Sequence, residues 1–369
     1  MTTYLDYNAT APIRPSVIDA MTEAARTHGN PSSVHAQGRA ARHRIEAARR
    51  AVAALVGREG ADVVFTSGGT EADALAVRGL GRTPILVSAI EHDAVLAAAP
   101  DAPRIAVTGD GVIDLAELEA RLTPQTPGLV CVMWANNETG VVQPIAEIAR
   151  LAHAAGWLLH VDAVQGAGRL DPAAVGEVDS LALSAHKIGG PPGIGALVLR
   201  DGLAVTALIC GGGQERGRRS GTENDVGIAG FAVAAREAAE TREPETRRLI
   251  DLRDRIAAGV TAAAQEARIM GAGAERLCNT LSIALPGVAA ETQVMALDLA
   301  GIAVSAGSAC SSGKVKRSHV LDAMHPGDPI AGQAIRVSLG WASTTEDADR
   351  FLHAWGAMRD RLSPAASQP

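Results

Sequence analysis

Residues 162–199, DAVQGAGRLDPAAVGEVDSLALSAHKIGGPPGIGALVL, contain the pattern that decides the fold. Two short apolar runs, 180–185 and 194–199, are separated by a glycine-rich segment, and a third run, WLLHV, ends immediately before Asp162. Short continuous apolar runs with polar residues at their ends are typical of strands that are buried on both faces of a sheet. The stretch therefore predicts neighbouring strands of an α/β sheet.

The chain on the N-terminal side continues the same alternation. Apolar runs at 84–90 and 128–134 alternate with segments of helical spacing at 34–57 and 145–155, which predicts a mostly parallel sheet with helices on both faces. At 369 residues the chain exceeds the size of one ordinary core. We predict a large sheet domain over 16–243 and a smaller α+β domain from 1–15 and 244–369. The charged segment TREPETRR predicts a break between two helices at their junction.

Composition and charge describe an ordinary globular protein. The chain is 47% hydrophobic and 20% charged, and its formal net charge of −7 argues against nucleic acid as a direct partner. No segment has the roughly 18 consecutive apolar residues of a membrane span, and the N-terminus resembles no export signal. The four cysteines are too dispersed for a disulfide framework or a zinc site. We expect a cytoplasmic protein with no metal site and no membrane contact. The cysteines are Cys131, Cys210, Cys278 and Cys310.

Asp162 and Lys187 together indicate a pyridoxal-phosphate site. A lysine that forms an imine must lose its proton, and an acid near the ring keeps the pyridine nitrogen protonated, so that the ring accepts electrons. Each residue alone has an ordinary explanation, because polar residues often close a strand and lysines are usually at the surface. However, polar residues follow three strands in succession, at Asn137, Asp162 and Ser184 with His186 and Lys187. Ligands of open parallel sheets bind at these carboxyl ends.

Two further features depend on that pair for their interpretation. FTSGGTEADAL (65–75) predicts a strand, a turn and a helix whose first N–H groups, at Gly69 and Thr70, would bind a phosphate. The alternative is an ordinary turn with Thr70 as the helix cap. His92 follows the strand at 84–90 and would lie on a flat cofactor ring and move protons, or else be a structural histidine.

Cys310 differs from the other cysteines in its surroundings. It lies in SAGSACSSGK, where all neighbours are small or polar, whereas Cys131 lies inside an apolar strand and is expected to be a buried core residue. A mobile, exposed loop rich in glycine and serine is where a reactive thiol is placed. We therefore predict that Cys310 is a nucleophile.

These motifs resemble the cysteine desulfurases of the NifS/IscS-like group, which are class-V aminotransferase relatives and pyridoxal-phosphate-dependent transferases of fold type I. The resemblance covers nearly the whole chain. It rests on YLDYNATAP, GNPSSVHAQGR, FTSGGTEA, EHDAV, NNETGVVQPI, HVDAVQGAG, SAHKIGGPPGIGAL, GGGQERGRRSGTEN, GSACSSG and AIRVSLG.

The resemblance implies a role for each site residue. The catalytic residues would be Lys187 as the Schiff-base lysine, Cys310 as the sulfur-accepting cysteine and His92, which stacks on the ring. Asp162 would pair with the pyridinium nitrogen and Gln165 would donate to the ring hydroxyl. The phosphate ligands would be Gly69, Thr70, Ser184, His186 and, from the other subunit of a homodimer, Thr222. Asn137 and Arg336 would bind the substrate carboxylate, for which the fork of an arginine is suited.

The implied reaction converts L-cysteine to L-alanine, with a persulfide formed on Cys310. The sulfur would then pass to an acceptor protein such as an iron–sulfur scaffold, for cluster assembly or another sulfur-transfer pathway. Two alternatives remain open at this point. Another fold-type-I enzyme, an aminotransferase or a kynureninase-like hydrolase, would share Lys187 and Asp162 without needing Cys310, and a protein that only binds assembly partners would need neither.

Overall fold

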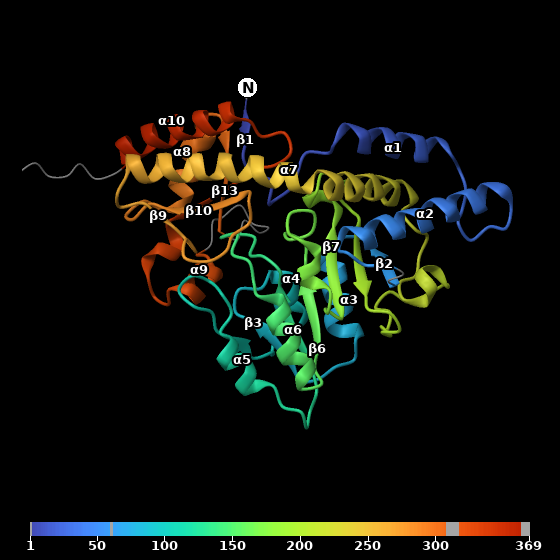
Figure 1. Cartoon of the computed structure of the whole chain (residues 1–369). Helices are drawn as coiled ribbons and strands as arrows, with labels where there is room; N and C mark the ends of the chain where they lie inside the picture. The colour runs from blue at the N-terminus through green and yellow to red at the C-terminus, as the bar shows by residue number, and fades with distance from the viewer. Residues whose placement is uncertain (1, 60–61, 308–316, 363–369) are drawn as a thin grey trace, which may run out of the picture.

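The structure, a computed structural model, describes residues 2–59, 62–307 and 317–362. Its largest element is a seven-stranded sheet below α7 in Figure 1, with the strand order β2-β8-β7-β6-β5-β3-β4. Only β8 is antiparallel to its neighbours in this sheet, which confirms the mostly parallel α/β architecture. The strands are β2 (Asp62–Thr66), β3 (Ile85–Ser88), β4 (Arg104–Ile105), β5 (Leu129–Met133), β6 (Leu158–Asp162), β7 (Ser180–Ser184) and β8 (Gly195–Leu199).

Helices cover both faces of this sheet, as predicted. Consecutive residues of β5 point to opposite faces: Cys131 packs in one apolar cluster with Val95 of α4, and Val132 packs in another with Ile148 of α6 and Phe231 of α7. The predicted helix at 34–57 is also confirmed. The helices of this part are α1 (Pro15–Arg26), α2 (Ala36–Leu55), α3 (Gly69–Gly79), α4 (Asp93–Ala98), α5 (Leu115–Arg121) and α6 (Ile145–Ala154), with short 3-10 helices at Pro172–Val175, Ala185–Lys187 and Gln214–Gly217.

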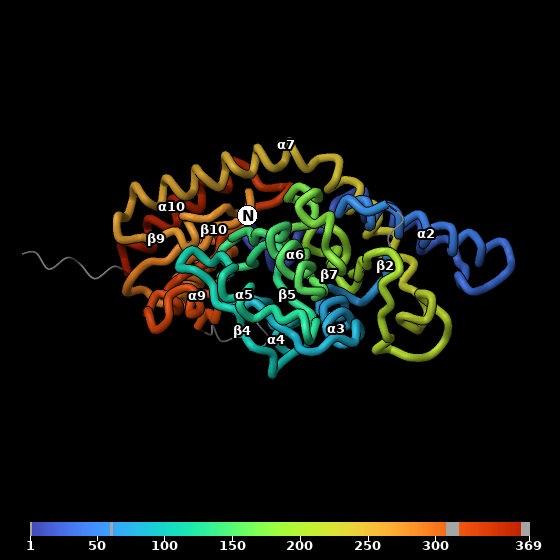
Figure 2. The backbone as a smooth tube through the Cα atoms, turned by 60° about the horizontal axis from the view of Figure 1, so that its bottom comes forward, coloured from blue at the N-terminus to red at the C-terminus, as the bar shows by residue number. Residues whose placement is uncertain are grey.

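The helix break predicted at TREPETRR is wrong. α7 runs without interruption over Asp225–Ala263 and contains Pro244 (Figures 1 and 2). A proline removes a helical hydrogen bond and clashes with the preceding turn, at a cost of about 3 kcal/mol. The helix is held on both sides of the proline, because Ala238 belongs to the core of the large sheet and Leu249 to a second core. This packing outweighs the local cost.

The second core belongs to the C-terminal part of the chain. There, Leu5 from the N-terminus packs with Ile283 and Phe351. A four-stranded antiparallel sheet has the order β12-β13-β10-β9. The division into 16–243 and 1–15 with 244–369 stays a proposal, which the two separate cores support. The elements are β1 (Thr3–Tyr4), β9 (Arg268–Ile269), β10 (Thr280–Ala284), α8 (Ala290–Leu299), β11 (Ile302–Ala303), β12 (Ser305–Ala306), α9 (His319–Met324), a 3-10 helix (Pro329–Gly332), β13 (Ala334–Ser338) and α10 (Thr345–Leu362).

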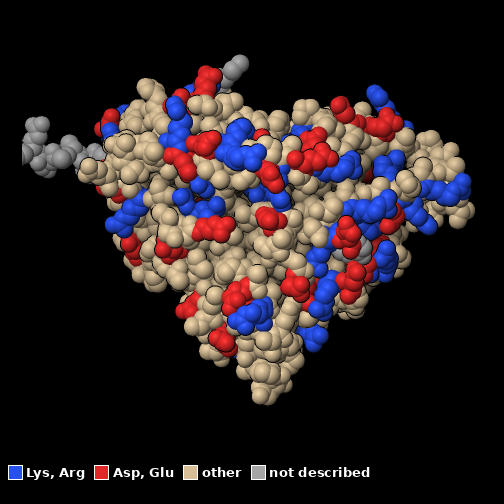
Figure 3. All heavy atoms as spheres, viewed as in Figure 1, with Lys and Arg blue, Asp and Glu red and all other residues tan. Residues whose placement is uncertain are grey.

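The surface carries charges of both signs. On the face drawn in Figure 3, basic and acidic side chains are interspersed rather than gathered into one patch of a single sign. In the described part of the chain, every helix is too short or too polar to cross a bilayer.

Candidate active site

A cavity of about 310 Å³ lies at the carboxyl edge of the large sheet. It is formed where β2, β5, β6 and β7 end, and β13 of the smaller sheet contributes Arg336 to its wall. All predicted site residues line it except two. Cys310, and with it the predicted mobile loop, lies outside the described residues, and Thr222 is exposed and does not line this cavity. The predicted residues that line it are Gly69, Thr70, His92, Asn137, Asp162, Gln165, Ser184, His186, Lys187 and Arg336.

Lys187 reaches the cavity from the 3-10 helix that follows β7. Its Nζ donates hydrogen bonds to the backbone carbonyls of Asn8 (2.6 Å) and Ala9 (2.8 Å). Burial, followed by the nearby cations of Arg336 and Arg169, lowers the pKa of Lys187 to about 8. About a tenth of this amine is therefore uncharged at pH 7, far more than for an ordinary lysine with a pKa of about 10.4, and the uncharged amine is the form that acts as a nucleophile.

Asp162 ends β6 and is buried at the cavity wall, where its Oδ1 accepts a hydrogen bond from the Val164 backbone (2.9 Å). Burial is the main cause that raises the pKa of Asp162 to about 7. A cationic ligand placed against this carboxyl would restore its ionisation, because an opposite charge lowers a carboxyl pKa. The site thus favours a ligand that brings a positive charge to Asp162.

His160, two residues before Asp162 in β6, belongs to a buried group of hydrogen-bonded polar side chains. His160 Nε2 is 3.1 Å from Asp73 Oδ1, and His160 Nδ1 is 2.9 Å from Ser180 Oγ. Burial raises the pKa of Asp73 to about 8 and lowers that of His160 to about 4, so both are predominantly uncharged at neutral pH. Asp162 is then the carboxyl at this wall whose charge a ligand can set.

The first turn of α3 forms an anion cradle beside Lys187. Gly69 and Thr70 begin the helix, so their N–H groups have no partner within it. A Cβ added at Gly69 would lie 2.8 Å from Val164 Cγ2 and 3.6 Å from Ser184 Cβ. A larger residue at position 69 would clash with the Val164 side chain, so glycine is needed for this arrangement of the cradle.

Three more predicted side chains are fixed by hydrogen bonds around the cavity. His92 is the N-cap of α4, and its Nδ1 accepts from the Ala94 backbone N–H (3.1 Å). His186 Nδ1 lies 3.1 Å from Thr10 Oγ1, and burial lowers the pKa of His186 to about 4. Gln165 Nε2 donates to the Asn8 carbonyl (3.0 Å).

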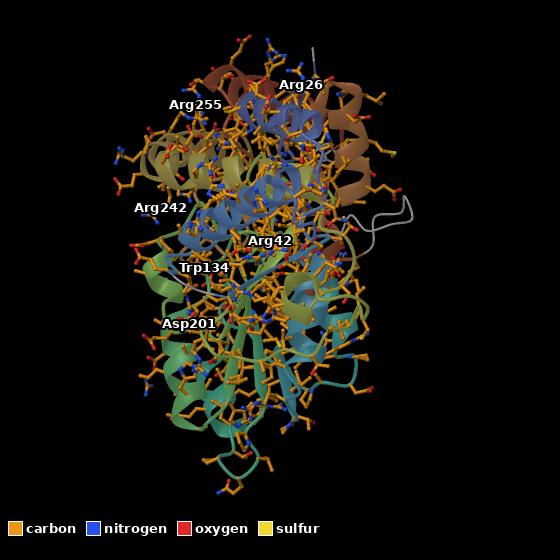
Figure 4. The ribbon with its side chains drawn as sticks, turned by 90° about the vertical axis from the view of Figure 1, so that its right-hand side faces the viewer. Arg26, Arg42, Trp134, Asp201, Arg242 and Arg255 are labelled. Atoms are coloured by element: carbon orange, nitrogen blue, oxygen red, sulfur yellow. The ribbon has the colours of Figure 1, made fainter. Side chains whose placement is uncertain are left out.

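Small residues beside Gln165 let a large aromatic residue support this wall. Trp134, labelled in Figure 4, is 1% exposed. A Cβ at Gly166 would lie 2.5 Å from its ring. The turn that carries Gln165 consequently packs directly on Trp134.

Arg336 has one group left for a ligand. Its Nη2 pairs with Asp6 (2.7 Å) and its Nη1 donates to the Asn137 carbonyl (3.1 Å). Its Nε is buried and has no hydrogen-bond partner among the described residues. An unsatisfied buried donor is costly, and here a ligand carboxylate would satisfy it.

Sequence reasoning missed several residues of this cavity. Asp73 was detectable, because its spacing of four from Gly69 places both on one helix face. Asn8, Glu138 and Gly307 lie inside motifs quoted above but had no assigned role. His319 carried no local signal, because long-range folding brings it to the cavity. The missed residues include Asn8, Asp73, Glu138, Gly307 and His319.

The fold and the cavity define an α/β protein with a lysine-bearing ligand site at the carboxyl edge of its sheet. The class-V aminotransferase family matches residues 3–351. A cysteine desulfurase of Cereibacter sphaeroides is 45% identical, over 97% of this chain and 96% of the relative. An IscS-like cysteine desulfurase of Mycobacterium tuberculosis is 40% identical, over 95% and 94%. The X-ray structure of a NifS-like protein from Rickettsia africae superposes with a TM-score of 0.90 at 34% identity, covering 98% of this chain and 100% of that one.

The chain belongs to the class-V aminotransferase family and, within it, to the NifS/IscS-like cysteine desulfurases. Enzymes of this family depend on pyridoxal phosphate, and its cysteine desulfurases act on L-cysteine and commonly form dimers.

Proposed function

We propose that this enzyme binds pyridoxal phosphate and converts L-cysteine to L-alanine, with the sulfur transferred to Cys310 as a persulfide. The observation that carries the proposal is one cavity in which Lys187, whose pKa is lowered to about 8, and the buried Asp162 stand together beside an anion cradle. When bound, the cofactor would supply an electron sink that accepts the electrons released as bonds within the substrate are cleaved.

The residues present fit this cofactor. The cradle of Gly69 and Thr70, kept open by the absence of a Cβ, suits a phosphate dianion. Asp162 would face the protonated ring nitrogen, and Gln165 would donate to the ring hydroxyl. His92 would lie on the ring, while Ser184 and His186 would complete the phosphate site.

The other end of the cavity suits the substrate carboxylate. We assign this role to Arg336, through its unpartnered Nε, and to the side-chain amide of Asn137. An amino acid held there would have its α-carbon directed toward Lys187. Binding two ends of the substrate fixes the bond to be cleaved, which is the main contribution that positioning makes to catalysis.

The sulfur then leaves the enzyme by transfer to another protein. A persulfide on Cys310 requires a reducing compartment to be regenerated, which is consistent with a cytoplasmic enzyme. The acceptor would be a protein such as an iron–sulfur scaffold. We also propose a homodimer in which Thr222 of each subunit contacts the phosphate in the other, since Thr222 is exposed and does not line its own cavity.

The test is product analysis of the purified holoenzyme with L-cysteine and a thiol reductant. We expect L-alanine and sulfide in equal amounts. Formation of pyruvate in place of alanine, or transfer of the amino group to a keto acid, would contradict the proposal and favour a different reaction of the same fold.

Replacing Asp162 with asparagine should lower turnover by about 10²-fold, because the neutral amide does not hold the ring nitrogen protonated.

The same replacement should raise the stability of the apoprotein. Since folding raises the pKa of Asp162 to about 7, this carboxyl costs stability as pH rises from its ordinary value through 7, and the amide removes that cost. We expect a higher apoprotein Tm for Asp162→Asn than for wild type at pH 8, and no such difference at pH 4. An unchanged turnover, or a lower Tm at pH 8, would contradict this account.

A further inference from the structure

Arg169 contacts two residues of the active-site cavity but does not line that cavity itself. It lies in the turn after β6 that also carries Gln165, and its side chain is partly buried. Its Nη2 donates to the backbone carbonyl of Lys187 (2.8 Å), and its Nη1 donates to that of Gln165 (2.8 Å). One guanidinium therefore joins the two backbone segments that carry the proposed attachment lysine and the proposed donor to the ring hydroxyl.

The same guanidinium sets which end of the Gln165 amide faces the cavity. Arg169 Nη1 also lies 3.4 Å from Gln165 Oε1. An arginine only donates hydrogen bonds, so the amide oxygen turns toward it. The amide nitrogen is thereby directed the other way and donates one N–H to the Asn8 carbonyl (3.0 Å). Its second N–H has no acceptor among the described residues, which leaves it for a ligand in the cavity.

The charge of Arg169 has no carboxylate partner within the described part of the chain, in contrast to two neighbouring arginines. Arg336 pairs with Asp6 (2.7 Å). Arg14 pairs with Glu237 (3.5 Å). The side-chain bonds of Arg169 go to uncharged oxygens instead. Since a cation partly removed from water is costly without a counter-ion, the position of Arg169 is hard to explain by stability alone.

The charge of Arg169 acts on the amine of Lys187. Both residues line a second cavity, of about 50 Å³. Burial first, and then the cations of Arg336 and Arg169, lower the pKa of Lys187 to about 8, while Asp162 and Asp6 raise it. A positive charge disfavours a second one nearby, so Arg169 favours the uncharged amine, which is the form that attaches the cofactor.

The other titratable groups of this region are paired or uncharged at neutral pH. Glu245, which lines the second cavity, is bonded to Arg248 (2.8 Å). Burial raises the pKa of the Cys278 thiol and of the Tyr7 hydroxyl, so both keep their protons. Burial and then the charge of the adjacent lysine lower the pKa of His186 to about 4, so its ring is neutral. None of these groups cancels the charge of the arginine.

We infer that Arg169 is a positioning residue of the active site, which joins the backbone of Lys187 to the turn of Gln165 and places an uncompensated positive charge beside the lysine. The inference rests on the proposed function and adds to it a residue that acts without touching substrate or cofactor. Arg169 acts through Lys187, whose amine it helps to keep uncharged, and through Gln165, whose N–H donor it directs away from itself.

The test is the titration of Lys187 in the apoprotein, followed by carbon-13 NMR of lysine-labelled protein. The sequence contains two other lysines, so the Lys187 signal is identified as the one that Lys187→Ala removes. In wild type we expect a midpoint near pH 8. Arg169→Gln keeps an N–H donor but removes the charge, and we expect its midpoint to lie about one pH unit higher. An unchanged or lower midpoint would overturn the inference.

Arg14→Gln is the matched control. Arg14 Nε donates to the next backbone carbonyl, that of Ile188 (3.3 Å), and Arg14 lines the same second cavity. The charges that act on Lys187 do not include it. We therefore expect Arg14→Gln to leave the midpoint of Lys187 at its wild-type value. A shift as large as that of Arg169→Gln would mean that any disturbance of this region moves the amine, and the inference would fail.

A second variant separates the charge from the two-armed bond. Arg169→Lys keeps a positive charge but lacks the planar fork. We expect the midpoint of pyridoxal phosphate uptake by the apoprotein, measured against pH, to stay near that of wild type in Arg169→Lys and to rise in Arg169→Gln. A midpoint in Arg169→Lys that rises toward that of an ordinary lysine would overturn the inference, even if Arg169→Gln did not fold. If wild type released no alanine from L-cysteine, the proposed function would fail, and the NMR titration would still decide whether Arg169 acts on Lys187.

Discussion

Cys310→Ala is expected to reduce sulfide release from L-cysteine to the background of an assay without enzyme. The proposed reaction needs a thiolate to attack the substrate sulfur, and alanine has no atom to take its place. The cofactor cavity is built from other residues, so pyridoxal phosphate content should remain that of wild type. The measurement is alanine and sulfide from the same reaction, with the persulfide located by mass spectrometry of the protein.

The chain supplies a control for this variant. Cys210 is an exposed free thiol that does not line the cavity, so Cys210→Ala should keep the wild-type rate. Cys131 and Cys278 are buried, and burial raises the pKa of both thiols, which makes them poor nucleophiles. Sulfide release that survives in Cys310→Ala, or a persulfide found on Cys210, would show that the sulfur takes another route.

The sequence predicted the sheet and its polar edge because both follow from short-range patterns. An apolar run such as that of β5 can be buried on both faces only inside a covered sheet, and Asp162 and Ser184 end their strands where parallel strands meet at one edge. The rule that ligands bind at the carboxyl ends of parallel strands was enough to predict that these residues share one cavity.

Other features could not be predicted, because they depend on contacts between distant segments. Pro244 locally favours a break, and only the two cores that flank it keep α7 continuous. The carbonyl of Asn8 meets Lys187 across 179 positions of the chain, and His319 Nε2 lies 3.0 Å from the carbonyl oxygen of Glu91, 228 positions away. His92 caps α4 by accepting from the Ala94 backbone N–H, a contact that is visible only in the folded chain, and its proton-moving role stays a prediction.

Lys187→Ala should lower turnover by at least about 10³-fold, because it removes both the amine that attaches the cofactor and the group nearest the substrate α-carbon. The sequence contains two other lysines, Lys314 and Lys316, so the attachment point can be read unambiguously. We expect borohydride treatment of the holoenzyme to fix the cofactor on Lys187, and on neither of the other two.

Because only the uncharged amine reacts, cofactor uptake by the apoprotein should accelerate as pH rises toward the pKa of Lys187 at about 8 and level off above it. An ordinary lysine would keep accelerating to above pH 10. A reduced adduct on Lys314 or Lys316, or uptake that still accelerates above pH 9, would contradict the assignment, since burial and the cations of Arg336 and Arg169 are what hold this amine ready near neutral pH.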